Sequence, residues 1–471
     1  MTPRVVIAGT SSGAGKTSVT CGLIGALRQR GLRVQGFKVG PDYIDPSYHA
    51  MASGRPGRNL DAFLSGPELI APLARHGARD ADVAVVEGVM GLFDGASGRG
   101  ELASTGQVAK LLRAPVVLVV DATAMSRSVA AIVHGYRTFD PAINVAGVIF
   151  NRIGSDHHEQ LLREALEPLG VPVLGALRRD AALTAPERHL GLVPAIELEP
   201  GTRAALAALA TAVDRQVDVD AILALAATAP PLQDAPWSPE PPDGMAASGA
   251  RIAVAAGRAF SFHYRENLEL LAAAGAELLE FDPLTDPGLP AEAGALLLAG
   301  GFPEVFCAQL EANRPLRETI AEFAAADRPV LAECGGLLFL CRELDGHQMC
   351  GVIDTSARMT DRLTLGYREA TAATSTPWLR AGERVRGHEF HYTQIGLAAA
   401  ASAWVLSARG RERREGLVAG AVQASYLHVH WAAYPDLAWR FARAAAAVGV
   451  AAGRLTRAPA VASLEGEWGP A

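Results

Sequence analysis

Short, uninterrupted apolar runs alternate with amphipathic segments along the first part of the chain. Such runs are typical of parallel strands buried on both faces, and the segments between them have apolar residues at helical spacing. The runs predict strands at 5–8, 32–37, 83–86, 114–121, 146–152 and 171–177. The intervening segments predict helices at 19–27, 105–112, 126–136 and 158–169. This order predicts an α/β domain with a mostly parallel sheet flanked by helices.

The second part of the chain repeats this type of pattern after a change in composition. An Ala/Leu-rich segment at 202–225 predicts helix, and the cluster of prolines that follows it resists helix because proline removes a backbone donor. Apolar runs then resume and predict strands at 251–255, 277–281, 293–299 and 328–332, so we expect a second α/β unit. The predicted division is a first domain at 1–227, a proline-rich linker at 228–249, a second domain at 250–440 and a C-terminal tail at 441–471.

Length and composition limit the classes of protein to consider. At 471 residues the chain is too long for one core, and 49% hydrophobic with 20% charged residues is an ordinary globular balance. The net charge is −7 and no block of Lys or Arg is present, which argues against nucleic acid or an anionic membrane as a partner. No export signal or apolar run of ~18 residues is visible, and the five cysteines form no C-x-x-C pair. These features predict a cytoplasmic enzyme whose partners are small molecules, and they are compatible with a homodimer.

The clearest candidate binding site is the glycine-rich turn between the first predicted strand and the first predicted helix. Its sequence, GTSSGAGKT, begins at Gly9 and places Gly13 and Gly15 before Lys16 and Thr17, one residue longer than the usual G-x-x-x-x-G-K-[ST] loop. Glycines let backbone N–H groups converge on phosphate oxygens, and the following helix adds its N-terminal partial charge. Lys16 can then reach the β- and γ-phosphates, and the Thr17 hydroxyl can bind Mg²⁺. The turn predicts ATP binding with Mg²⁺, whereas an ordinary glycine-rich turn is the alternative.

Polar residues follow the second predicted strand, at the carboxyl end where open α/β sheets bind ligands. Lys38 comes first, in the segment FKVGPDYIDP, and Asp42 and Asp45 follow it. Lys38 could hold phosphate or a substrate carboxylate, and either aspartate could serve the metal or position the substrate. A polar turn shaped by its prolines is the alternative interpretation.

Two later strand ends carry further candidates. Glu87 ends the run 83–86, at a tip where P-loop proteins keep an acidic residue on Mg²⁺ or its waters, and Asp94 is a second carboxylate of the same segment. A glutamate salt-bridged at the strand end is the alternative for Glu87. Asn151 ends a later run, at a position that recognises the base in related nucleotide folds.

The second predicted domain has a reactive centre of its own, in the segment 328–340. A strand leads to Cys334, which is followed by two glycines and an apolar helix. This is the arrangement of a nucleophile elbow, in which small residues tolerate the tight turn and the helix N-terminus favours a thiolate. Backbone N–H groups of Gly335 and of Gly301 could form an oxyanion hole.

A cysteine nucleophile needs a base, and the segment YLHVHW supplies two histidines. His428 and His430 are two residues apart, so in a strand both would point to the same face. We favour His428 as the base, with His430 as the alternative. The remaining cysteines lack a following pair of glycines and are interpreted as core thiols.

Taken in chain order, these segments resemble the cobyrinic (or hydrogenobyrinic) acid a,c-diamide synthase family of corrin-pathway amidotransferases. The resemblance covers residue 4 to about residue 440. It implies a dethiobiotin-synthetase-like ATPase domain joined to a class I glutamine amidotransferase domain. The motifs that carry it are GTSSGAGKT, FKVGPDYIDP, VVEGVMGLFDG, FNRIGSDHH, GGFPE, AECGGLLFL, GHEFHY and YLHVHW.

The resemblance implies an ATP-dependent ligase of cobalamin biosynthesis that amidates the a and c acetate side chains of a corrin. An acyl phosphate would form at the ATP site, and ammonia released from glutamine by Cys334 and His428 would convert it to an amide. Many class I glutaminases read H-x-E where this chain has His428-Val-His430, so the usual third carboxylate is missing from its place. The resemblance also places Tyr43, Asp45 and Asp61 near the acceptor or ATP.

Three other functions compete with this interpretation. Cobyric acid synthase has the same two-domain logic and amidates other corrin carboxylates, and nickel-sirohydrochlorin a,c-diamide synthase is a close relative. A switch ATPase of the partitioning type belongs to another class, and it would need no glutaminase. The segment around Cys334 therefore argues against the switch ATPase.

Overall fold

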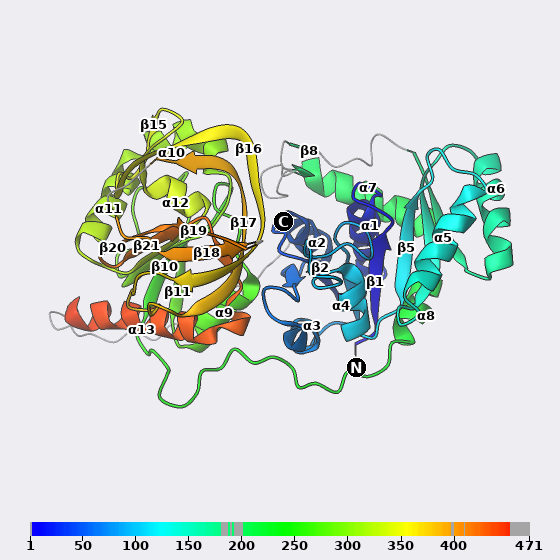
Figure 1. The fold of residues 1–471 in the computed structure, drawn as a ribbon, viewed down its shortest axis with the longest axis horizontal. Coiled ribbons are helices and arrows are strands. Elements are labelled where there is room, and N and C mark those ends of the chain that lie inside the picture. Colours follow the sequence, from blue (N-terminus) through cyan, green and yellow to red (C-terminus); the bar gives the residue numbers. More distant parts are fainter. Residues whose placement is uncertain are drawn as a thin grey trace.

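The chain forms two α/β lobes that lie side by side, with the first half of the sequence in one lobe and the second half in the other (Figure 1). The structure is a computed structural model. It describes residues 2–179, 187–188, 191–192, 201–396, 400–408 and 410–452.

The first lobe is built on a seven-stranded sheet with the order β3-β2-β4-β1-β5-β6-β7, and every neighbouring pair in it is parallel. The α/β fold with a parallel first sheet is therefore confirmed. The strands are β1 (Arg4–Gly9), β2 (Val34–Val39), β3 (Arg58–Leu60), β4 (Val83–Glu87), β5 (Val116–Asp121), β6 (Val145–Ile153) and β7 (Val173–Arg178).

Helices cover both faces of this sheet because successive residues of each strand point to opposite sides. Val5 and Ile7 of β1 pack in one apolar cluster with α1, α2, α7 and α8, whereas Val6 and Ala8 pack in another with α3 to α6. The helices are α1 (Lys16–Gln29), α2 (Ile44–Ser53), α3 (Ile70–Gly77), α4 (Thr105–Leu111), α5 (Ser128–Phe139), α6 (Asp156–Leu166), α7 (Gly201–Gln216) and α8 (Val219–Ala227).

Some elements of the first lobe differ from the prediction. The single helix expected at 202–225 is two helices, because the Asp218 carboxylate accepts the Ala221 N–H and caps a new helix there. Helix α2, helix α3 and the short strand β3 were not predicted. A two-residue pair, β8 (Glu187–Arg188) with β9 (Gly191–Leu192), lies between β7 and α7 in the chain.

The proline-rich linker runs as an extended segment along both lobes (Figure 1). Trp237 attaches it to the first lobe: its backbone N–H donates to the Pro72 carbonyl, 3.0 Å away. Its buried ring meets the His76 ring edge-on, with 5.0 Å between the ring centroids. The linker is therefore packed against the protein at this point.

The second lobe has a central sheet with the order β11-β10-β12-β13-β21-β20, parallel except for β20. Helix α13 crosses residue 440, the end expected for this domain, and residues 453–471 of the expected tail lie outside the described residues. The strands are β10 (Arg251–Ala255), β11 (Glu277–Phe281), β12 (Ala295–Leu298), β13 (Val330–Glu333), β20 (Leu417–Ala419) and β21 (Val422–Ser425). The helices are α9 (Arg265–Ala273), α10 (Cys307–Ala312), α11 (Arg314–Ala325), α12 (Gly335–Leu340) and α13 (Pro435–Ala452).

A second sheet of this lobe, which the sequence analysis did not predict, lies toward the first lobe (Figure 1). Its centre is a long antiparallel pair of strands, β16 and β17. Tyr367 and Glu369 of β16 contact the first lobe directly, through Asp61 and Arg99. The strands are β14 (Cys341–Leu344), β15 (His347–Gln348), β16 (Ile353–Ala372), β17 (Arg384–Ile395), β18 (Trp404–Ala408), β19 (Arg411–Glu415) and β22 (His428–Val429).

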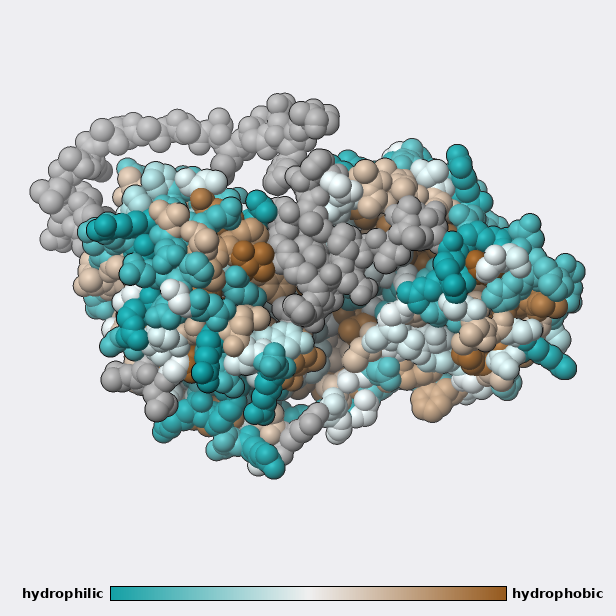
Figure 2. Space-filling model, turned by 90° about the horizontal axis from the view of Figure 1, so that it is seen from above, coloured by the Kyte–Doolittle hydropathy of each residue, from teal (hydrophilic) through white to brown (hydrophobic). Residues whose placement is uncertain are grey.

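On the face drawn in Figure 2, hydrophilic residues predominate and hydrophobic ones occur in small patches. Within the part of the chain that the structure describes, no helix combines the length and the apolar character that crossing a bilayer requires. Large hydrophobic side chains that are exposed include Met359, Leu363 and Leu365, all on β16.

Candidate active site

The glycine-rich turn joins the carboxyl end of β1 to helix α1, as a phosphate-binding loop requires. Gly13 and Gly15 adopt φ angles of 74° and 95°, a left-handed backbone that glycine allows without steric cost. The Lys16 ammonium donates to the Ser11 carbonyl at 2.8 Å and to the Met90 carbonyl at 2.6 Å, so the side chain lies back across the loop. Burial, together with the nearby Lys38 charge, lowers the pKa of Lys16 to about 8.

Glu87 is the hub of this site. The register of the sheet places Lys38 of β2 directly beside Glu87 of β4. The Glu87 carboxylate is fully buried and accepts hydrogen bonds from the Thr17 hydroxyl at 2.5 Å and the Lys38 ammonium at 2.8 Å. His49 of α2 lies 2.6 Å from its other oxygen, and Asp45 lies 2.5 Å from the Lys38 nitrogen. Two predicted strand-end residues and the predicted hydroxyl are therefore in direct contact.

The charges of Glu87 and Lys38 stabilise each other, whereas burial raises the pKa of Asp45 well above its usual range. Burial alone would raise the pKa of Glu87, but Lys38 and His49 outweigh it and hold that pKa well below its usual range. Conversely, Asp45 and Glu87 outweigh the burial of Lys38 and raise the pKa of its ammonium. A carboxylate that stays ionised and a lysine that stays charged are what phosphate and metal chemistry need here.

The donor set fits a magnesium ion that is held partly by nucleotide phosphates. Mg²⁺ in such sites is bound by one or two protein oxygens and completes its octahedron with phosphate oxygens and water. Thr17 and Glu87 supply a hydroxyl and a carboxylate at one point beside the loop. No group of three or more His, Cys, Asp or Glu side chains within the described residues could hold a metal by itself.

The remaining candidates of the first lobe lie around the same loop. The Asn151 amide donates to the Ala14 carbonyl at 3.0 Å, and a Cβ on Gly15 would lie 2.0 Å from the amide nitrogen, so Asn151 packs on the turn. Asp94 accepts the Gly91 N–H at 2.9 Å. Recognition of a base by Asn151 stays a prediction.

Two predicted substrate residues are engaged in local structure. The Asp42 carboxylate accepts the Ile44 N–H at 2.7 Å, at the start of α2. Asp61 is buried, and one of its oxygens accepts the N–H groups of Phe63 and Leu64 at 2.8 and 2.9 Å. Its other oxygen accepts the Tyr367 hydroxyl, 2.8 Å away, from the second lobe. These hydrogen bonds give both aspartates a role in holding the loops of the site.

Cys334 lies at the turn between β13 and α12, as expected for a nucleophile elbow. Its φ of 49° and ψ of −100° are a strained conformation for a residue with a side chain, of the kind that turns of this type impose. The Cys334 N–H donates to the Ser425 carbonyl at 2.7 Å, which anchors the turn to β21.

The helix N-terminus was predicted to stabilise a Cys334 thiolate, but burial has the larger effect on the pKa of this thiol. Cys334 is only 5% exposed, and α12 is a single short helix of six residues. Burial, reinforced by the negative charge of Glu304, raises the pKa of the Cys334 thiol, and the Gly335 N–H opposes this only in part. The free protein therefore carries the protonated thiol, which makes the neighbouring base essential.

The two glycine turns predicted to form an oxyanion hole lie against each other. A Cβ on Gly335 would lie 3.0 Å from the Gly301 nitrogen, and a Cβ on Gly301 would lie 2.1 Å from the Ala259 carbonyl oxygen. Only glycine therefore fits this approach of backbone to backbone. The two turns therefore approach each other closely, and an oxyanion hole formed by the Gly301 and Gly335 amides stays a prediction.

His428 and His430 occupy different surroundings. Strand β22 contains only His428 and Val429, so the strand expected through both histidines ends before His430. The His428 ring lies against Gly300, where an added Cβ would be 2.5 Å from its Cε1. His430 instead lies 3.4 Å from the Glu266 carboxylate and packs on Tyr264, with ring centroids 4.7 Å apart. The position beside the glycine turn supports His428 as the base.

The two centres meet across the contact between the lobes. The Tyr43 ring, at the start of α2, stacks on Phe262 with centroids 5.1 Å apart and lies 5.1 Å from the His428 ring. Beside it, a cavity of about 180 Å³ opens between the lobes. Its lining residues are Pro41, Asp42, Tyr43, Ile44, Phe262, Leu365, His388 and Phe390.

A buried ion pair joins the lobes next to this cavity. Arg58 of β3 donates to Glu266 at 2.7 Å and to Glu269 at 2.5 Å, both on α9. Although burial would raise it, the pKa of Glu266 is lowered to about 2 by His430 and Arg58. Glu269 also pairs with His76, 2.8 Å away. The sequence analysis missed these residues, since no local motif marks a contact between positions 208 apart.

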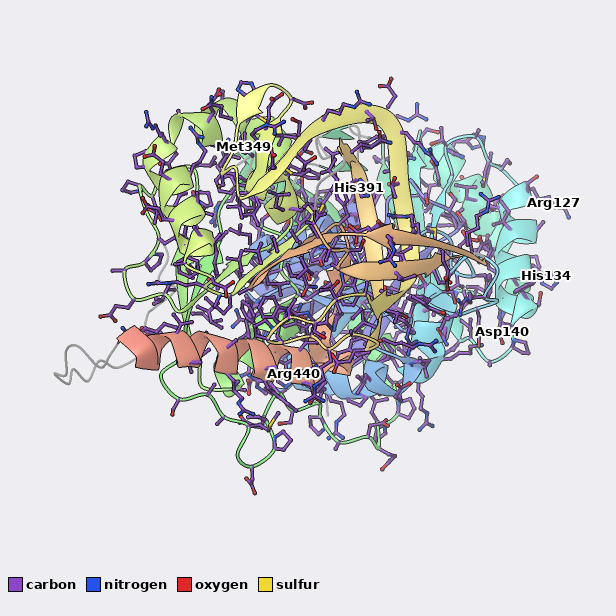
Figure 3. All side chains as sticks on the ribbon, turned by 60° about the vertical axis from the view of Figure 1, so that its left-hand side comes forward. Arg127, His134, Asp140, Met349, His391 and Arg440 are labelled. Carbon is purple, nitrogen blue, oxygen red and sulfur yellow. The ribbon has the colours of Figure 1, made fainter. Side chains whose placement is uncertain are left out.

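A second buried carboxylate, Glu389 in the segment GHEFHY, supports the wall of the site. It accepts hydrogen bonds from Arg368, 2.5 Å away, and from Arg413. His391, which lies on β17 beside the curved β16 in Figure 3, stacks on Tyr426 with centroids 3.7 Å apart. This cluster fixes β17, whose His388 pairs with His428 in the sheet.

Comparison with known proteins assigns both lobes. The family of CobQ/CobB/MinD/ParA nucleotide binding domains matches residues 5–193, and the family of CobB/CobQ-like glutamine amidotransferase domains matches residues 251–435. The nucleotide-binding family confirms the predicted use of ATP.

Related proteins match most of the chain. It is 54% identical to the hydrogenobyrinate a,c-diamide synthase of Streptomyces coelicolor, over 93% of this chain and 96% of the relative. It is 48% identical to the protein of the same name from Thermobifida fusca, over 94% and 96%. It is 46% identical to the cobyrinate a,c-diamide synthase of Syntrophotalea carbinolica, over 93% and 98%.

The contact between Gly300 and His428 gives a first test. Gly300→Ala would place a methyl group 2.5 Å from His428 Cε1, so the ring must move. We expect glutamine hydrolysis to fall on the order of 10²-fold, because small displacements of reacting groups have effects of that size. Gly135→Ala, where an added Cβ meets nothing within 4 Å, is the matched control and should keep full activity. Wild-type hydrolysis by Gly300→Ala would show that His428 is not the base.

Glu415 gives a test of pH dependence. Burial raises its pKa from 4.5 to about 7, although its bonds to the Ser425 hydroxyl and the Tyr426 N–H oppose the shift. The pKa of Glu415 is higher in the folded protein than in the unfolded chain, so its protonated carboxyl stabilises the fold. This contribution to the free energy of unfolding is fully present below pH 4.5 and is lost as the pH rises through about 7. We expect a loss of about 3 kcal/mol in the free energy of unfolding across this window.

The measurement is urea unfolding of the second lobe at pH 5 and pH 8. Glu415→Gln should remove most of the difference, because an amide does not ionise. Glu412→Gln changes an exposed glutamate of the same strand and should leave the difference unaltered. Equal pH dependence in all three proteins would contradict the assignment.

Proposed function

The chain belongs to the hydrogenobyrinate and cobyrinate a,c-diamide synthase family, and on this premise we propose how its two lobes divide one amidation. The first lobe, residues 1–227, uses ATP to activate a corrin carboxylate. The second, residues 250–440, releases ammonia from glutamine, and residues 228–249 link the two. The enzyme is therefore an ATP-dependent carbon–nitrogen ligase with glutamine as the amide donor.

One observation carries this proposal: His428, the proposed base of the glutaminase, packs against Tyr43 in a loop of the ATPase lobe. The His428 ring lies 5.1 Å from the Tyr43 ring, and Asp45, two residues after Tyr43, lies 2.5 Å from Lys38. Ammonia released beside His428 thus starts next to the segment that ends at the ATP site. A switch ATPase of the partitioning type has no use for such a contact.

At the ATP site, the carboxylate of the corrin attacks the γ-phosphorus and ADP leaves. Lys16 would turn from its carbonyl partners toward the phosphates, and the loop amides around Gly13 and Gly15 would hold them. A magnesium ion held by Thr17 and Glu87 supplies charge neutralisation when it is bound. The product is an acyl phosphate, a far better acyl donor than the carboxylate.

At the second site, Cys334 attacks the side-chain amide of glutamine. His428 takes the thiol proton and then gives it to the departing ammonia, which leaves a thioester. The amides of Gly301 and Gly335 stabilise the oxyanion of the tetrahedral intermediate. Water then hydrolyses the thioester to glutamate.

The ammonia attacks the acyl phosphate across the junction between the lobes, and phosphate leaves as the amide forms. The cavity beside Tyr43, which residues of both lobes line, is our candidate for the route of the ammonia. The same loop presents Asp42 and Asp45, and Asp61 and Asp94 border the site, so these residues are proposed to position the acceptor. Two such cycles convert the a and c acetates.

The relatives with the higher identities are named for hydrogenobyrinate, and those named for cobyrinate are less similar. We therefore propose the cobalt-free corrin as the preferred acceptor. Incubation of the enzyme with ATP, glutamine and either corrin, followed by mass spectrometry, tests this. Diamide formed only from the cobalt corrin would contradict it.

Cys334→Ala tests the division of labour. Without the thiol, amidation with glutamine should fall to background, whereas ATP-dependent amidation with added ammonium chloride should continue, because the first lobe is intact. Cys341→Ala, a change at a buried core thiol, is the control and should keep both activities. Loss of both activities in a folded Cys334→Ala protein would refute separate centres.

Lys16→Ala tests the other half. Amidation from either nitrogen source should fall on the order of 10³-fold, because the charge that stabilises the transferring phosphoryl group is gone. Glutamine hydrolysis by Cys334 should remain measurable. Lys110→Ala, which removes a half-exposed ammonium paired with Asp140, should change neither activity. Ammonia-dependent amidation that survives in Lys16→Ala would exclude this loop as the ATP site.

A further inference from the structure

A carboxylate that no motif assigns lies beside the histidine of the glutaminase. Glu333 is the last residue of β13 and directly precedes Cys334. Its Oε2 lies 3.5 Å from Nδ1 of His428. Nδ1 is buried and has no hydrogen-bond partner among the described residues, so its contact with Glu333 is a close approach rather than a formed hydrogen bond. The ring therefore has one side toward the glycine turn of Gly300 and the other toward Glu333.

The other buried carboxylates of this region are committed elsewhere. Glu266 is paired with Arg58, and Glu389 is held by Arg368 and Arg413. Glu415 accepts from the Ser425 hydroxyl and the Tyr426 N–H. Glu333, by contrast, makes no ion pair with Lys or Arg in the part of the chain that the structure describes. It is thus the carboxylate available to His428.

The position where other class I glutaminases carry their glutamate cannot serve here. His430 occupies it, and its ring faces Glu266 and Tyr264. The charge that orients the base must therefore come from a different element, and β13 supplies it.

We propose that Glu333 is the positioning carboxylate of His428. It accepts the Nδ1–H and so fixes the tautomer in which Nε2 is free to take a proton. As the Cys334 sulfur bonds to the amide carbon of glutamine, the thiol proton passes to Nε2, and Glu333 faces the imidazolium that results. The proton leaves with ammonia when the C–N bond breaks. This inference rests on the proposed glutaminase activity and does not depend on which corrin accepts the ammonia.

The groups that face His428 from every packed element make Glu333 the one charge beside it. Tyr43 faces the ring from the first lobe, and burial raises the pKa of its hydroxyl well above the usual range, so it is neutral. His388 faces it from β17, with centroids 6.2 Å apart, and burial together with His428 lowers the pKa of His388 to about 3. Cys334 is a protonated thiol in the free protein.

The test is the pH profile of glutamine hydrolysis by the full chain. In Glu333→Gln the negative charge beside Nδ1 is gone, so the imidazolium is less stabilised and the acid limb of kcat/KM moves to lower pH by roughly one unit. The rate at the optimum falls on the order of 10²-fold, because the imidazolium loses its partner. Amidation with ammonium chloride should be unchanged.

The control is Glu383→Gln. It also removes one negative charge, but from a glutamate that pairs with Arg440. Arg440 lies on α13, apart from His391 in Figure 3, and its partner Glu383 directly precedes β17. This variant should keep the wild-type profile and rate. Glu333→Asp keeps the charge on a shorter arm, so its acid limb should stay near that of the wild type even as the rate falls.

Several outcomes would overturn the proposal. An acid limb that does not move in Glu333→Gln, whether the rate is intact or reduced equally at every pH, assigns Glu333 a structural role or none. If Glu333→Gln does not fold, Glu333→Asp decides instead. A shift of its acid limb by a full pH unit from that of the wild type would also overturn the proposal. A wild-type chain that hydrolyses glutamine but amidates no corrin would refute the proposed acceptor only. One that hydrolyses no glutamine would refute both proposals.

Discussion

The arrangement of the whole molecule depends on one buried guanidinium. The Arg58 side chain, on β3 of the first lobe, forms ion pairs with Glu266 and Glu269 on α9 of the second. Removing one partner from a buried pair of this kind typically costs roughly 3–5 kcal/mol, because the remaining charge stays out of water. The residue next to Arg58, Asn59, donates to the carbonyls of Gly40 and Asp42 and so holds the loop that carries Tyr43. The same strand thus fixes the lobes and the loop between their reactive centres.

The two centres use the same geometry for different chemistry. In each lobe, parallel strands end at one edge of a sheet, and small residues turn the chain into a helix there. In the first lobe this presents backbone N–H groups and Lys16 to phosphate. In the second it presents a strained cysteine to an amide, with the base supplied by a neighbouring strand. At the first centre Glu87 is paired with Lys38 and His49, and Lys38 is also paired with Asp45.

Most of the first sheet could be predicted because its strands leave local signals, and the turns that carry Lys16 and Cys334 could be located in the same way. Apolar runs mark buried strands, and the runs at 5–8 and 83–86 lie within the fully buried strands β1 and β4. The β16–β17 pair could not be predicted, because buried positions of β17 such as His388, Glu389 and His391 are polar and give no apolar alternation in the sequence. The contact of Arg58 with α9 has no local pattern either. Asp42 shows what a local motif leaves open: its carboxylate accepts the Ile44 N–H at the start of α2 and also lines the cavity, so its contact with a substrate stays a prediction.

The buried pairing of Arg58 with α9 bears on how such enzymes can be rearranged. Cutting the chain within its proline-rich segment would seem to yield two independent modules. Each fragment would instead expose charged residues that normally pair with the other lobe. These are Arg58 on one fragment and two glutamates on the other. A chimaera that borrows its nitrogen-supplying module from another amidotransferase would consequently need matching carboxylates on the helix equivalent to α9, whatever the quality of the transplanted catalytic machinery.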